Sequence, residues 1–161
     1  MRLLLSTLLL LALAIMACQS DDLSRTVATS SEADKAAVRE VFEQSVEKWN
    51  ANDLDGLMAF IADDVVQMPP GRSTIDGKEA LRSDWEKFLS ENSDKWEPTI
   101  EDIEVSGDLA FVRIKELETT TPKDGSETKT LIGKGISIYR RGEDGSWRNV
   151  IEIWNSNESN D

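Results

Sequence analysis

The sequence has 161 residues, and its 31 acidic and 18 basic residues give a formal net charge of −13 at pH 7. This acidity disfavours nucleic acid and anionic lipid headgroups as direct partners, because both are bound through basic side chains. There is no histidine, and Cys18 is the one cysteine. Zinc sites built from His and Cys and Ser-His or Cys-His nucleophile pairs are therefore excluded. Without a calcium-loop pattern, we expect no metal site and no cofactor.

The first predicted element is an apolar run from Leu3 to Ala17, preceded by Arg2 and followed by Cys18. A positive start, a short apolar segment and a small residue before the cleavage site are typical of a secretory signal peptide. The run is too short to span a membrane comfortably. Residues 15–18 resemble the bacterial lipoprotein box, which implies that Cys18 is lipidated and incorporates palmitate. An ordinary cleaved signal with an incidental cysteine is the alternative.

Lipidation would anchor the protein to a membrane of a bacterial cell envelope. Gln19, next to the cysteine, implies the periplasmic side of the outer membrane if the host has two membranes. Residues 1–17 are then a signal peptide, and residues 18–31, rich in Ser, Thr and Ala, are predicted to be a flexible tether. We predict one domain over residues 32–156 and a disordered tail over 157–161.

Three helices are predicted next. Apolar residues recur at three- and four-residue spacing over 38–49, which is typical of an amphipathic helix. Asp53 is the predicted N-cap of a second helix, whose apolar stripe runs over 54–61. A short strand follows over 65–68 and ends at two prolines. The third helix is predicted over 78–89, after a glycine.

From Trp96 onward the hydrophobic period changes to two, which indicates strands. Turn residues separate these strands, so consecutive strands should form antiparallel hairpins. Helices followed by a meander indicate an α+β domain. Gly133 and Gly135, inside one strand, are predicted to mark a bulge or bend that curves the sheet. The predicted strands cover residues 99–105, 109–121, 127–141 and 147–155.

Several stretches, in this order and spacing, resemble the nuclear transport factor 2-like superfamily, which includes ketosteroid isomerase and SnoaL-type polyketide cyclases. The end of the sequence is similar to the SnoaL-like branch. The resemblance implies a cone-shaped fold in which three N-terminal helices pack on a curved antiparallel sheet and leave an apolar pocket. The stretches that carry it are residues 49–53, 62–70, 75–81, 106–110, 144–148 and 153–156.

The resemblance implies that large side chains line the mouth of this pocket, and packing in the core is the alternative for each of them. Asn155 is a further candidate, which either orients a ligand carbonyl or ties down the chain end. The large candidates for ligand binding are Trp49, Phe60, Met68, Trp85 and Trp154.

Glu152 is the candidate general base, because strict alternation places it on the same strand face as Trp154, where desolvation would raise its pKa. Alternation places Asn149 on the opposite face. The competing interpretation of Glu152 is cross-strand ion pairing with basic side chains on an exposed face. Tyr139 and Asp64 are candidates to assist; a rim hydrogen bond and helix capping are the alternatives.

Two functions remain open. The first is a lipid-anchored envelope protein that binds a small apolar or amphipathic molecule, or a partner, in the cone. The second is a carboxylate-dependent isomerase, cyclase or lyase that uses Glu152. The lack of histidine and of a matched acid–base pair favours the first. A homodimer is also possible, through an apolar stripe on the sheet that contains Leu109, Phe111 and Leu117.

Overall fold

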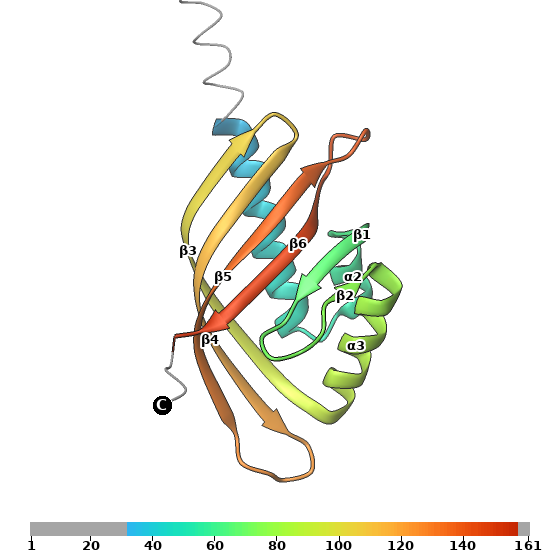
Figure 1. Ribbon diagram of the computed structural model, residues 1–161, viewed down its shortest axis with the longest axis vertical. Helices are drawn as coiled ribbons and strands as arrows, with labels where there is room; N and C mark the ends of the chain where they lie inside the picture. The colour runs from blue at the N-terminus through green and yellow to red at the C-terminus, as the bar shows by residue number, and fades with distance from the viewer. Residues whose placement is uncertain (1–31, 158–161) are drawn as a thin grey trace, which may run out of the picture. The chain divides into compact units, whose positions relative to one another are not determined.

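A helix occupies residues 32–50 of the described chain and packs against the sheet that the C-terminal half forms (Figure 1). The structure is a computed structural model in which residues 32–157 are described. The predicted signal peptide, Cys18, the tether and residues 158–161 of the predicted tail lie outside these residues. The chain divides into two units at Asp34, and residues 35–50 of this helix belong, with every element described below, to the second unit, Lys35–Asp161.

Two further helices follow. Helix α2 (Leu54–Met58) is capped by Asp53, whose side chain accepts a hydrogen bond from the Gly56 N–H at 2.9 Å. Helix α3 (Lys78–Glu91) begins after Gly77, which has a φ of 89°. The prediction that the second helix continues through Ile61 is wrong. Ile61 instead begins a strand, because pairing with Asn149 of the last strand outweighs its place in a helical stripe.

The described residues form one six-stranded sheet in the order β2-β1-β6-β5-β4-β3. The antiparallel meander β3–β6 is as predicted, although β3 begins directly at the end of α3. The prediction of a wholly antiparallel sheet is wrong, because β1 pairs in parallel with β6 and the sheet is therefore mixed. The strands are β1 (Ile61–Met68), β2 (Ile75–Asp76), β3 (Asn92–Ser106), β4 (Leu109–Pro122), β5 (Lys129–Arg141) and β6 (Trp147–Ser156).

Two apolar clusters hold the helices on the sheet. In the first, Val38 and Phe42 of the N-terminal helix pack against inward residues of the strands, including Val112 and Tyr139. In the second, Leu81 of α3 joins residues of α2 and β1: Met58, Ile61 and Val65. The helices therefore cover one face of the sheet. In each cluster the apolar face of a helix meets the apolar residues that alternate along the strands.

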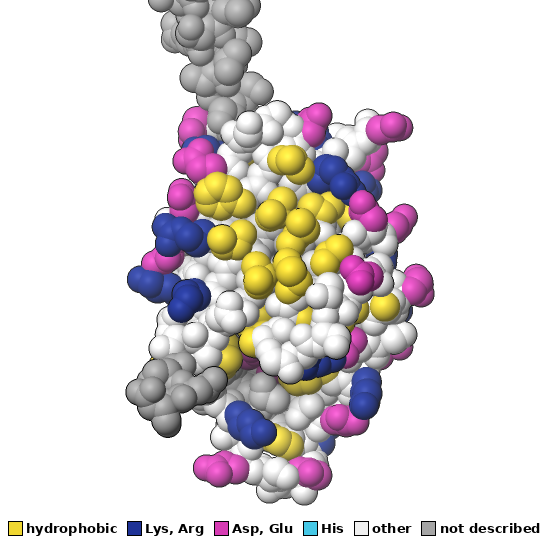
Figure 2. Space-filling model, viewed as in Figure 1, with side chains coloured by type: hydrophobic (Ala, Val, Ile, Leu, Met, Phe, Trp, Pro, Cys, Tyr) yellow, Lys and Arg dark blue, Asp and Glu magenta, His cyan; other side chains and the backbone are white. Residues whose placement is uncertain are grey.

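The opposite face of the sheet carries exposed apolar side chains (Figure 2). Leu109 and Leu117 of the predicted stripe are 51% and 38% exposed. Neighbouring strands extend the patch, since Leu117 pairs with Ile132 of β5 and Ile136 pairs with Ile153 of β6. This surface is called the outer patch below.

Gly133 and Gly135 mark no register shift, so the bulge alternative of that prediction is wrong, whereas the sheet is curved as predicted (Figure 1). The register shifts lie elsewhere, between Ile61 and Val66, between Ile100 and Asp102, and between Ile138 and Tyr139. The two glycines instead make room. A β-carbon at Gly133 would lie 2.8 Å from Oε1 of Glu116, and one at Gly135 would lie 3.3 Å from Cβ of Trp154.

Candidate functional site

A cavity of about 110 Å³ lies on the helix-covered face of the sheet. An apolar cavity of about 150 Å³ holds a benzene molecule, so the space is on the scale of a small organic group. Every helix and five of the six strands in the described chain contribute to its wall. The aromatic and polar lining residues are Phe42, Ser45, Trp49, Gln67, Trp85, Trp96, Glu116, Glu118, Ser137, Tyr139, Asn149, Glu152 and Trp154.

Strand β4 supplies two carboxyl groups that the sequence analysis missed, Glu116 and Glu118. The inward face of this strand begins with Ala110, Val112 and Ile114, all buried, and then continues at the same period of two. Because alternate residues share a face, that period was a sufficient signal for both glutamates.

Glu152 of β6 lies at the cavity wall, where it is held by neutral groups. The amide of Gln67 donates a hydrogen bond to its Oε2 at 2.9 Å, and the Ser137 hydroxyl donates to its Oε1 at 3.4 Å. Burial is the main cause that raises the pKa of Glu152, and the charge of Glu116 raises it further, whereas the hydrogen bond from Gln67 lowers it. A carboxyl in this setting is a stronger base than one in water.

The basic residues considered as ion-pair partners of Glu152 point to other groups. Arg148 pairs with Asp144 at 2.6 Å, Arg140 pairs with Asp64 at 2.6 Å, and Lys134 donates to Oδ1 of Asn157. This geometry favours the cavity interpretation of Glu152 over the exposed ion-pair interpretation.

Strand β6 contains a bulge, so the prediction that its residues alternate strictly between the two faces of the sheet is wrong. Ile138 pairs with Ile151 and Tyr139 pairs with Asn149, so one extra residue, Val150, lies between the two pairs. An extra residue reverses the alternation that follows it. Asn149 and Glu152 therefore both line the cavity, although strict alternation put them on opposite faces.

Glu116 has one satisfied and one unsatisfied oxygen. Its residue is 7% exposed, and the indole N–H of Trp96 donates to Oε2 at 2.9 Å. Its Oε1 is buried and has no hydrogen-bond partner among the described residues. Burial raises the pKa of Glu116, and the Trp96 hydrogen bond opposes that rise. Buried polar atoms are nearly always paired, so an open acceptor beside a cavity is a distinctive feature.

Glu118 is a third acid in the cavity whose pKa is strongly raised. Burial, followed by the charges of Asp94 and Glu116, raises its pKa to about 8, and it shares a hydrogen bond with Asp94. Asp94 also accepts hydrogen bonds from Nε1 of Trp49 at 2.9 Å and from the Thr120 hydroxyl at 2.6 Å. At neutral pH Glu118 is therefore mostly a neutral acid, whose O–H donates a hydrogen bond to the carboxylate of Asp94.

Tyr139 lines the same cavity and is 3% exposed. Burial and the nearby charge of Glu152 raise the pKa of its phenol, while a hydrogen bond with Asn149 lowers it. The phenol is therefore neutral and keeps its proton over the physiological range. It can serve as a hydrogen-bond donor at the cavity wall, but not as a base.

The cavity gathers five of the predicted site residues: Trp49, Trp85, Tyr139, Glu152 and Trp154. Their roles in ligand binding or catalysis stay predictions. Four further lining residues were not predicted as site residues, because strand pairing rather than a local motif brings them to the cavity: Gln67, Trp96, Ser137 and Asn149.

Four other predicted site residues are not in the cavity lining. Asp64 is exposed and bound to Arg140, and Asn155 is exposed on β6. Phe60 contributes a backbone carbonyl that accepts from the Asn149 N–H at 2.8 Å. Met68 is half-buried and pairs with Ile153 of β6. These positions give no geometric support to a direct role in the cavity.

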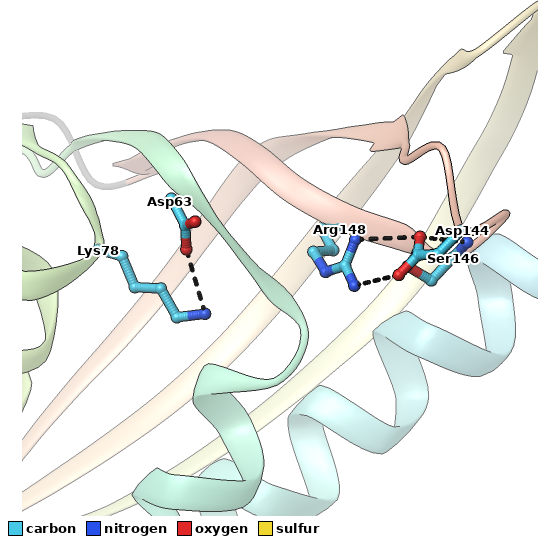
Figure 3. A network of polar contacts seen from close by, with 5 residues as sticks. All are labelled: Asp63, Lys78, Asp144, Ser146 and Arg148. Carbon is cyan, nitrogen blue, oxygen red and sulfur yellow. Dashed lines mark hydrogen bonds and ion pairs between the residues drawn. The ribbon is translucent and has the colours of Figure 1, made fainter.

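A second hollow contains basic side chains, but its charges are already paired. Lys78 lies 3.6 Å from Asp63, and Arg148 binds Asp144, which also accepts from Ser146 (Figure 3). Arg140 binds Asp64. The ion pair with Arg148 and the hydrogen bonds from Ser146 hold the pKa of Asp144 well below its usual range. Because a carboxylate already neutralises each of these basic side chains, the hollow is not a binding site for an anion.

Within residues 32–157, no three carboxyl or thiol side chains are placed to hold a metal ion.

Over the same residues, no helix has the length and apolar character needed to cross a membrane.

The fold and the cavity define an α+β protein of the nuclear transport factor 2-like class, with a curved mixed sheet, three helices and an interior site. The model of the SnoaL-like domain matches residues 38–150, and the chain belongs to that family. No curated protein matches the sequence.

Solved structures share this fold. A conserved protein from Planctomyces limnophilus is 29% identical, with a TM-score of 0.70 over 75% of this chain and 94% of its own. A ketosteroid isomerase-like protein from Erwinia carotovora atroseptica is 22% identical, with a TM-score of 0.71 over 78% and 97%. A hexachlorocyclohexane dehydrochlorinase from Novosphingobium barchaimii is 19% identical, with a TM-score of 0.68 over 78% and 88%.

Proposed function

We propose that this protein is a carboxylate-dependent isomerase or lyase that acts on a small, largely apolar molecule in the cavity, with Glu152 as the general base. The observation that carries the proposal is the setting of Glu152, which lines an aromatic cavity, is held by Gln67 and Ser137, and has a raised pKa. The isomerase-like and dehydrochlorinase names of two proteins with this fold support the same class of chemistry.

In the proposed reaction, an ionised Glu152 takes a proton from a carbon next to an electron-withdrawing group, and its carboxylate becomes a carboxylic acid. The electron pair of the broken C–H bond forms a new carbon–carbon double bond. In an elimination the bond to the leaving group breaks, and the leaving group departs with the electron pair of that bond. In an isomerisation the π electrons of the electron-withdrawing group move onto its oxygen, and they return when Glu152 gives the proton back at another carbon. Gln67 and Ser137 fix the carboxyl, and neutral Tyr139 donates a hydrogen bond to developing negative charge.

A probe reaction tests Glu152 without knowledge of the natural substrate. In nitrobenzisoxazole a base removes the ring C–H proton, the N–O bond breaks and a coloured phenolate is released. We expect the purified full-length protein to catalyse this elimination, and Glu152→Gln to lower kcat/KM by about 100-fold or more. Glu127→Gln, at an exposed glutamate, is the matched control and should leave the rate unchanged. An unchanged rate in Glu152→Gln contradicts the proposal.

A binding protein without turnover is the second candidate, and one feature favours it. The groups that donate to Glu152 are an amide and a hydroxyl, so the carboxyl is not paired with a second acid. In this case the cavity would hold its small apolar or amphipathic ligand unchanged. Native mass spectrometry of the purified protein that reveals a co-purifying molecule, together with no probe turnover, selects this candidate.

We propose further that the protein is held at the bacterial cell envelope by a lipid on Cys18, at the periplasmic side of the outer membrane if the host has two membranes. The lipoprotein-box pattern of residues 15–18 supports the proposal. An acidic sequence with a formal net charge of −13 gains little from anionic headgroups, so acyl chains are the appropriate anchor.

A further inference from the structure

We infer that the ligand of the cavity is an amphipathic organic ammonium ion, whose nitrogen is held by Glu116, Glu118 and Glu152 and whose apolar part packs on the tryptophan rings. The inference rests on the proposed function, in that the cavity is the ligand site. It adds the chemical class of the molecule that enters it.

The charge of the cavity wall is one-sided. Three glutamates face the space, and the residues that line it include no lysine and no arginine. The nearest carboxyl neighbour, Asp94, adds to the negative side through its hydrogen bond with Glu118. Buried carboxylates are costly unless a positive charge accompanies them, and in the described chain no side chain supplies that charge within the cavity. A cationic ligand would supply this positive charge.

The open oxygen of Glu116 gives the inference a specific contact point. Its Oε1 is buried without a hydrogen-bond partner, whereas Oε2 is satisfied by Trp96. The chain keeps space for this oxygen, because a β-carbon at Gly133 would come within 2.8 Å of it. An unpaired carboxylate oxygen requires a donor, and an ammonium group carries up to three N–H donors and no acceptor.

The rest of the wall suits the other end of such a molecule. Trp49, Trp85, Trp96 and Trp154 line the cavity, and tryptophan is the aromatic side chain that attracts cations most strongly. Contacts with neighbouring groups fix two of these rings: Trp49 packs edge-on against Trp85 at 5.4 Å, and the indole N–H of Trp96 is bound to Glu116. Rigid aromatic walls around carboxylates match a cation with an apolar body.

Ligand binding should also be coupled to proton release. The acids that face Glu118 are Asp94 from β3, Glu116 from β4 and Glu152 from β6, and the phenol of Tyr139 also lies at the wall. In the free protein these like charges and burial keep Glu118 protonated up to about pH 8. An ammonium ion in their midst favours the ionised form, so Glu118 should release its proton when the cation binds.

The test compares three probes of nearly the same shape that differ in charge: benzylammonium, benzyl alcohol and benzoate. Binding to the purified full-length protein is measured by calorimetry at about pH 7, in buffers of different ionisation enthalpy, which reports the protons released. We expect benzylammonium to bind at least about tenfold more tightly than benzyl alcohol, with proton release, and benzoate to bind least. Glu118→Gln should abolish most of this preference and the proton release, while Glu127→Gln should change neither.

Equal or tighter binding of benzyl alcohol or benzoate overturns the inference, and so does the absence of benzylammonium binding. These outcomes are distinguishable from failure of the proposed function. Elimination of nitrobenzisoxazole, an uncharged probe, reports Glu152 as a base whether or not the cavity prefers cations.

Discussion

Glu118→Gln should stabilise the fold, and the gain should grow with pH. The pKa of Glu118 rises from 4.5 to about 8 in the folded protein, chiefly because the carboxyl is buried. At about 1.36 kcal/mol per pH unit, that rise corresponds to about 5 kcal/mol, and water in the open cavity should reduce it to about 2 kcal/mol. Glutamine keeps the shape and offers Asp94 an amide N–H donor in place of the carboxyl O–H, but it has no charge to bury.

The sign follows from proton binding. Below pH 4.5 both folded and unfolded chains hold the Glu118 proton, so the residue has no effect on the free energy of unfolding. Between pH 4.5 and about 8 the unfolded chain releases that proton and the folded chain keeps it, so stability falls as pH rises. Above that range the free-energy cost of burying the ionised Glu118 carboxylate is constant. Glu118→Gln removes this cost.

Urea unfolding at several values between about pH 5 and about pH 9 measures this difference. The stability of Glu118→Gln minus that of the wild type should be small at the acid end and reach its full value near the alkaline end. Glu127→Gln, an exposed control, should track the wild type throughout. A variant that is less stable than the wild type at neutral pH, or a difference that does not vary with pH, refutes the reasoning.

Three further outcomes are expected. Gly133→Ala should lower the free energy of unfolding by about 1–3 kcal/mol, because the new methyl meets the Glu116 carboxyl and the Asn155 carbonyl; adding Glu116→Ala should recover part of the loss, and a neutral Gly133→Ala would contradict this packing. If the outer patch pairs two copies, sedimentation should show a dimer that Leu117→Lys converts to a monomer, and a wild-type monomer at high concentration removes dimerisation. Cys18→Ala should abolish radioactive palmitate labelling in cells, and unchanged membrane retention of that variant argues against acylation.

The helices and the meander could be predicted because each depends on a local period. Residues 38–49 show helical spacing, Asp53 caps α2, and the strands after Trp96 alternate between apolar and polar residues. Three features escaped that reasoning. The strand conformation of Ile61, the parallel pairing of β1 with β6 and the bulge at Val150 all depend on contacts between distant segments. No local pattern contains that information.

The site was predicted in part. Glu152, Tyr139 and three tryptophans do line one cavity, although Asp64, Phe60, Met68 and Asn155 do not. Glu116 and Glu118 could have been found by following the inward positions of β4, since they share the period of its buried residues. Trp96 and Gln67 could not, because pairing with other elements decides what they face.

The sequence by itself determined the composition of this site: an acidic protein without histidine and with five tryptophans, whose proton chemistry is left to carboxyl groups, Tyr139 or a lysine. The tertiary structure decided which carboxyl groups meet. A one-residue bulge in β6 turns Glu152 toward Glu116 and Glu118, and burial in the shared cavity changes their proton affinities. Desolvation and mutual repulsion act over a few ångströms in space, and spacing along the chain does not encode that distance.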